Sequence, residues 1–153
     1  LLFRMSKIVA LGGGIVTRIC EGQFGITRRE WTVLAIVARA PSMALSEVGH
    51  RCEIDNARLS RAVSSLVAKK LMRKTHRPDR QIDLQLTDAG MALHASLFPI
   101  ALDINRKMID ALDPDVVHAL DDALALLHAQ GVQLVRDTVV PKGRRSHADR
   151  RKA

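Results

Sequence analysis

The chain has 153 residues, of which 47% are hydrophobic and 26% charged, which is enough for one compact domain or for a small domain with an oligomerisation element. Aromatic residues make up only 3% and Tyr is absent, so the composition favours helices packed on aliphatic side chains over a β-sandwich. The net charge of +8 is concentrated in residues 51–80 (+6) and 142–153 (+5), while the remainder sums to −3. Such a distribution is typical of a surface that binds a polyanion.

Cysteine usage and hydropathy exclude several classes of protein. Cys20 and Cys52 are far apart and form no pair or set with metal-ligand spacing, so neither a disulfide framework nor a zinc site is indicated. The N-terminal apolar stretch is interrupted by Gly12–Gly14 and has no small-residue cleavage site, which argues against a signal peptide. We therefore expect a cytoplasmic protein with no cofactor, no metal and no membrane span.

The first predicted helix spans about Leu2–Glu21, because Met5, Ile8, Ile15 and Ile19 recur at helical spacing. Gly12–Gly14 interrupts its apolar stripe and indicates either a kink or a close crossing with another helix. These glycines are not a phosphate-binding loop, because no strand precedes them and no Gly-Lys-Ser/Thr sequence follows.

Thr27–Glu30 has the sequence of a capping box, in which a Thr hydroxyl and a Glu carboxylate accept hydrogen bonds from each other's free N–H groups. The helix that it opens should stop before Pro41. A short helix at about 44–51 and a longer one at about 55–70 should follow, with Asp55 as the N-cap of the longer helix.

The longer helix has two different faces. Leu59, Val63, Leu66 and Val67 form one apolar stripe, which should pack against the protein. Polar side chains occupy the rest of its circumference, where they can reach phosphates and base edges in a major groove of DNA. The candidate DNA contacts on this helix are Asn56, Arg58, Ser60, Arg61, Ser64 and Ser65.

Two short strands are predicted at Met72–His76 and Ile82–Leu86, since apolar residues alternate with polar ones in the second and the segment between them has turn chemistry. Arg77 and Arg80 lie at the tip of this hairpin and are further candidate DNA contacts. Two helices joined by a tight turn and followed by a hairpin make a winged helix-turn-helix.

Two further helices are predicted after the hairpin. Thr87 caps the first, and Asp113 followed by Pro114 opens the second. Both carry apolar residues at near-heptad spacing, which indicates a subunit interface, with packing inside one chain as the simpler alternative. From Pro141 onward the chain is polar, basic and aperiodic, which is typical of a disordered tail.

From Leu1 to about Val135 the chain resembles the MarR (multiple antibiotic resistance regulator) family of transcription factors. The resemblance is carried by "ITRREWTVL", by "LSEVGHRCEIDNARLSRAVSSLVAKKLMRK" and by "DRQIDLQLTDAG", in that order. It implies a homodimer in which both termini form a helical dimer domain and two winged helices bind a pseudo-palindromic operator. One departure is Glu53, which replaces the glycine usual in the turn of the helix-turn-helix and disfavours a left-handed backbone there.

The resemblance also implies roles for single residues. Arg61 matches a frequent arginine of the family's recognition helix, and Arg80 matches a wing arginine that enters the minor groove. A small ligand, often aromatic, commonly binds between the dimer and DNA-binding regions of the family, which makes Arg18, Trp31 and His50 candidate ligand contacts. Some relatives sense peroxide through a cysteine in the first helix, so Cys20 is a redox candidate; a buried structural thiol is the alternative that we favour.

These observations predict a mostly α-helical protein with a small β-hairpin wing, a winged helix-turn-helix flanked by N- and C-terminal dimerisation helices. The expected regions are an N-terminal dimerisation helix (1–26), the DNA-binding domain (27–87), C-terminal dimerisation helices (88–138) and a basic disordered tail (139–153). The expected function is that of a sequence-specific transcriptional regulator, most simply a repressor released from DNA by a ligand. The alternatives are a non-specific nucleic-acid-coating protein and a winged-helix adaptor for protein interactions; no catalytic motif indicates an enzyme.

Overall fold

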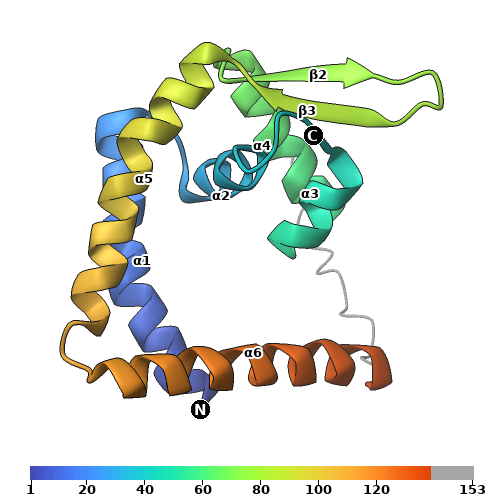
Figure 1. The fold of residues 1–153 in the computed structure, drawn as a ribbon. Helices are drawn as coiled ribbons and strands as arrows, with labels where there is room; N and C mark the ends of the chain where they lie inside the picture. The colour runs from blue at the N-terminus through green and yellow to red at the C-terminus, as the bar shows by residue number, and fades with distance from the viewer. Residues whose placement is uncertain (139–153) are drawn as a thin grey trace, which may run out of the picture. The chain divides into compact units, whose positions relative to one another are not determined.

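The structure is a computed structural model that describes residues 1–138 (Figure 1). The basic tail predicted from the sequence therefore lies outside the described residues. Elements follow one another in the order α1 (Leu2–Phe24), α2 (Arg28–Val37), β1 (Met43–Ala44), α3 (Leu45–Cys52), α4 (Asn56–Ala68), β2 (Met72–His76), β3 (Ile82–Leu86), α5 (Asp88–Ile109) and α6 (Pro114–Asp137). The prediction of a mostly helical fold with a small hairpin is confirmed. Within residues 1–138, no helix has the length and apolar character needed to cross a membrane.

The chain divides into two units, Leu1–Asp110 and the segment from Ala111 onward. The first unit contains α1–α5 and the sheet, and α1 and α5 run side by side within it (Figure 1). The second unit contributes α6 to the described part of the chain. The functional residues considered below belong to the first unit.

Local sequence signals set where the helices of the first unit begin. The Thr27 hydroxyl accepts from the Glu30 N–H at 3.2 Å and the Glu30 carboxylate accepts from the Thr27 N–H at 2.6 Å, so the predicted capping box is present. Asp55 caps α4 by accepting from the Arg58 N–H at 2.8 Å. The first helix extends past its predicted end at Glu21 to Phe24 and stops at Gly25, whose φ of 63° is left-handed.

The turn between α3 and α4 keeps a left-handed residue without glycine. Glu53 is the C-cap of α3 with φ 51° and ψ 36°, a conformation that costs a residue with a Cβ more than it costs glycine. We expected Glu53 to disfavour a left-handed backbone at this turn, and that expectation is wrong. The surrounding helices hold the backbone of Glu53 in the turn. The helix-turn-helix forms with the usual backbone and a charged side chain at its corner.

The hairpin joins a third strand that the sequence did not predict. β3 lies in the middle of an antiparallel sheet with the order β1-β3-β2, and Leu84 pairs with Lys74 on one side and with Met43 on the other. The two predicted strands have the bounds expected from the sequence. Because β1 belongs to the link between α2 and α3, the base of the wing is hydrogen-bonded to the helix-turn-helix.

The core of the first unit is aliphatic, as the composition predicted. The apolar stripe of α4 lies in it, with Leu59, Val63 and Leu66 buried and Val67 partly buried. Other fully buried side chains come from α2, α3, the sheet and α5, and they include Leu34, Val37, Val48, Leu84 and Leu97. The polar face of α4 is therefore turned away from the core.

Gly12 and Gly13 mark close approaches of α1 to two other helices. A Cβ at Gly12 would collide with the Met108 thioether of α5, and one at Gly13 would collide with the Arg28 guanidinium at the start of α2. α1 continues through both positions as one helix. Of the two interpretations of the glycines, a close helix crossing is confirmed.

The second unit shows an apolar surface on its described helix. Asp113 caps α6 by accepting from the Asp115 N–H at 2.9 Å, with Pro114 at the first helical position as predicted. None of the residues of α6 is buried. Its exposed large apolar side chains include Val116, Leu120, Leu124, Leu127, Val132 and Leu134.

Candidate nucleic-acid interface and ligand cavity

The polar face of α4 presents side chains that can donate to and accept from nucleic acid. Five of the six predicted contact residues on this helix are exposed, and we call them the exposed row of α4: Asn56, Arg58, Ser60, Arg61 and Ser64. Arg58 pairs with the helix cap Asp55 at 3.1 Å, with more than half of each side chain in water. Such a surface pair contributes little to stability, so Arg58 can exchange it for a phosphate at small cost.

Ser65 differs from the other predicted contacts. It is half-buried, and its side chain helps to lower the pKa of the Glu30 carboxyl of α2. The structure therefore separates Ser65 from the exposed row and turns it toward the protein. The helical spacing of the polar residues could not reveal this, because the partner is on another helix.

The tip of the wing holds the two predicted arginines in different ways. Arg77 Nε donates to Asp83 Oδ2 of β3 at 2.7 Å, so its guanidinium is fixed along the hairpin. Arg80 is exposed and sits at the turn with φ 65°, and the Arg77 N–H closes the loop on the Gln81 carbonyl at 2.8 Å. Figure 1 shows this hairpin projecting from the helices of the first unit.

A polar cluster around the buried Glu30 carboxylate lies between α2 and the C-terminal end of α4. Lys69 Nζ donates to both carboxylate oxygens of Glu30 at 3.0 and 2.9 Å and to the Gly25 carbonyl at 2.8 Å. Burial would by itself raise the pKa of Glu30, but hydrogen bonds from Ser65, Lys69 and the Thr27 N–H outweigh it and hold the pKa below its ordinary value. Glu30 is thus an ionised carboxylate inside the protein.

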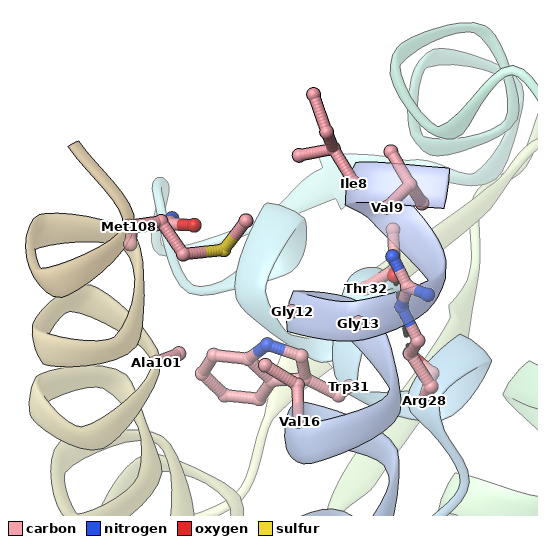
Figure 2. Close-up of a pocket in the computed structure, with 11 residues that line it drawn as sticks. Ile8, Val9, Gly12, Gly13, Val16, Arg28, Trp31, Thr32, Ala101 and Met108 are labelled. Carbon is pink, nitrogen blue, oxygen red and sulfur yellow. Dashed lines mark hydrogen bonds between the residues drawn. The ribbon is translucent and has the colours of Figure 1, made fainter. Parts of the chain in front are cut away.

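A cavity of about 370 Å³ lies between α1, α2 and α5 of the first unit. Figure 2 shows the Trp31 indole in the space between α1 and α5, with the Arg28 guanidinium alongside α1 at Gly13. Met108 and Ala101 border it from α5. A cavity of this size with an apolar wall, one aromatic ring and one cation has the character of a site for a small organic anion.

A second cavity, of about 620 Å³, lies where the end of α2, the base of the sheet and the start of α5 meet. His94 borders it and stacks on Trp31 at 5.6 Å between ring centroids. Phe98 stacks on the other face of His94 at 5.2 Å, and burial lowers the pKa of His94. One aromatic stack therefore connects the walls of both cavities.

The comparisons with known proteins agree with this geometry. Residues 24–82 match the model of the MarR family, and this segment holds the helix-turn-helix and β2. This segment of the chain is therefore similar to the MarR family. A solved member of that family is a transcriptional regulator in complex with DNA, which agrees with the prediction that the chain is not an enzyme.

The individual proteins that this chain resembles are distant from it in sequence. A MarR family transcriptional regulator from Streptomyces coelicolor, solved in complex with DNA, is 24% identical, with a TM-score of 0.78 over 87% of this chain and 86% of that one. BpsR of Bordetella bronchiseptica, whose DNA binding is regulated by 6-hydroxynicotinic acid, is 22% identical, with a TM-score of 0.68 over 82% and 98% of the two chains. An uncharacterized protein of Mycobacterium tuberculosis is 23% identical over 125 residues, which are 80% of this chain and 84% of that protein. The likeness to the two solved structures shows a shared fold.

The remaining candidate residues are the proposed ligand contacts and Cys20. Trp31 borders the first cavity, whereas Arg18 and His50 are exposed and border neither of the two cavities described. Cys20 is fully buried in the core, and burial is the largest influence on its thiol and raises its pKa. A raised pKa disfavours the reactive thiolate, which supports the structural interpretation of Cys20.

Proposed function

We propose that the chain is a cytoplasmic, homodimeric transcriptional repressor that binds a pseudo-palindromic operator and leaves it when a small aromatic ligand occupies the cavity beside Trp31. The observation that carries the proposal is the exposed row of α4, in which Arg61 is flanked by shorter hydrogen-bonding side chains. Such a mixture suits base edges and phosphates together. A protein that only coats nucleic acid needs charge and not varied donors.

The direct test is selection of bound duplexes from a random library at physiological salt. A homodimer with two such helices should enrich a pseudo-palindrome whose half-sites are about 34 Å, or one DNA turn, apart. Retention of DNA without enrichment of any sequence would favour the coating protein. An adaptor would bind neither the library nor the selected site and would instead capture a protein in the absence of DNA.

The position of the cavity supports the proposal that a ligand relieves DNA binding. It is bordered by α1, α2 and α5, and α2 also packs against the recognition helix α4. A ligand between these helices can therefore alter the presentation of α4. The relation to BpsR, which responds to 6-hydroxynicotinic acid, supports an aromatic acid as the class of ligand.

Ligand binding in the cavity can be followed by tryptophan fluorescence, because Trp31 borders the cavity and is the only tryptophan of the chain. We expect 6-hydroxynicotinate or a related aromatic carboxylate to change Trp31 fluorescence and to release the selected operator over the same concentration range. Arg28→Gln should abolish both effects by removing the cation of the cavity. Arg29→Gln, which removes the neighbouring exposed charge outside the cavity, should leave both intact; equal loss in the two variants would exclude Arg28 as the anion-binding group.

A further inference from the structure

We propose that Glu30, Ser65 and Lys69 form a positioning anchor that fixes the orientation of the recognition helix α4 relative to the α1–α2 corner, and that operator discrimination depends on it. This inference rests on the proposed function, since it assigns residues that act through α4 without touching DNA.

The first argument is burial. In the described part of the chain, Glu30 is the single charged residue in the buried class, and 4% of its side chain is exposed. A capping box at the start of α2 requires the Thr27 and Glu30 groups but does not require that the carboxylate be buried. Taking a carboxylate out of water is costly unless several donors satisfy it, and here the donor beyond Thr27 is Lys69, the C-cap of α4.

The second argument is direction. Lys69 has three N–H donors, and they are accounted for by the two Glu30 oxygens and the Gly25 carbonyl, all within 3.0 Å. Ser65 precedes Lys69 by four residues and therefore lies on the same face of α4. The three Lys69 bonds thus hold the C-terminal end of α4, and Ser65 lies on the face of the helix that they secure.

The third argument is the distance between the anchor and the residues that would contact DNA. α4 has 13 residues and is about 20 Å long, with the exposed row beginning at Asn56 at its free end. The apolar contacts of Leu59, Val63 and Leu66 hold the helix against the core, but the hydrophobic effect is non-directional. Hydrogen bonds at the opposite end fix rotation and tilt, because they weaken steeply with angle.

The fourth argument is what the anchor is attached to. Gly25 ends α1 and Glu30 lies in the first turn of α2, on either side of the corner between these helices. α2 also carries Arg28 and Trp31, which border the cavity. The anchor therefore connects the end of the recognition helix to the segment that a ligand would contact.

The test compares affinities for the selected operator and for a random duplex of equal length, at one salt concentration, below the unfolding temperature. Lys69→Met should lower operator affinity by about tenfold and leave random-duplex affinity within about twofold. Lys70→Met removes the adjacent exposed charge, and it should change the two affinities by the same factor. If Lys69→Met also lowers both affinities equally, Lys69 contacts phosphate and the anchor proposal is overturned.

A double-mutant cycle separates positioning from general damage. Glu30→Gln keeps the shape of the side chain and removes its charge, so Lys69→Met should cost less operator affinity in that background than in the wild type, because no buried charge is left unpaired. Additive effects would contradict the anchor. If Lys69→Met does not fold, Lys69→Arg takes its place in the cycle, since it retains the charge but changes the donor geometry. A wild-type protein that does not prefer the selected operator would instead refute the proposed function itself.

Discussion

Arg61 lies on the exposed face of α4, between the helix cap and the anchored end. Its forked guanidinium can donate two parallel hydrogen bonds to a guanine edge or to a phosphate. We expect Arg61→Ala to weaken operator binding by roughly 1–3 kcal/mol, measured as the ratio of dissociation constants. Arg106→Ala removes an equal charge from α5, where Arg106 pairs with Asp103, and should have little effect; wild-type affinity in the Arg61 variant would remove Arg61 from the interface.

Glu30 gives the protein a specific response to acid. Its pKa in the folded state is held below the ordinary value of 4.5, so the stabilisation that it provides is present above pH 4.5 and is lost as the pH falls through the folded-state pKa. We expect the midpoint of thermal unfolding of the wild type to fall in that window more steeply than that of Glu30→Gln. Parallel curves for the two proteins would show that Glu30 is not the group responsible, because Asp55 and Asp103, whose pKa values are also lowered, are common to both.

At the scale of elements, the start of α5 depends on Gly90. A Cβ there would collide with the Leu71 carbonyl, and Leu71 is held in place by a hydrogen bond from the Thr87 N–H to that same oxygen at 3.1 Å. We expect Gly90→Ala to lower the free energy of unfolding by about 1–3 kcal/mol. Gly22→Ala, in α1, meets no atom within 4 Å and should raise it by about 0.5–1 kcal/mol. Denaturant titration of both variants should therefore give shifts of opposite sign, and equal shifts would contradict the close approach at Gly90.

The elements that could be predicted from the sequence are those with local signals. The caps at Thr27, Asp55 and Asp113 act within three residues, and the alternation in β3 identifies a strand by itself. β1 could not be predicted, because two residues show no periodicity and their partners are 41 and 39 positions away in the chain. The same reason hides the contact between Lys69 and Glu30, which are 39 residues apart.

The candidate site was predictable to a similar extent. The exposed row of α4 follows from helical spacing, since residues opposite a buried stripe must face outward. Ser65 is at the border of that stripe, and only the position of α2 determines that its hydroxyl points inward. The cavity beside Trp31 requires three helices to meet, and the sequence pointed to it only through Trp31, as a residue that the family resemblance implied.

At the scale of the whole molecule, the exposed apolar residues predict a homodimer. α6 has no buried residue and exposes Leu120, Leu124 and Leu127 on one face, and α1 exposes Leu2 and Phe3. A row of exposed apolar side chains along a helix, as on α6, is rare on a monomer. We expect sedimentation equilibrium to give twice the chain mass of 16.9 kDa.

A matched pair of variants tests which surface is responsible. Leu124→Lys places a charge in the apolar row of α6 and should give a protein of single chain mass with weakened operator binding, because the half-sites are then bound separately. Asp122→Lys introduces the same side chain on α6 outside that row and should remain dimeric. A dimeric Leu124→Lys protein would place the subunit interface elsewhere.

The sheet register has a consequence for how such a protein can diversify. The β2–β3 ladder ends at the pair His76 and Ile82, and the residues beyond it close on themselves through Arg77 and Gln81. Substitutions or insertions within 77–81 therefore leave the pairing of β3 with β1 and β2 unchanged. In an evolving lineage, or in a laboratory library, the sequence of this tip can therefore vary while the three-stranded sheet below it keeps its register.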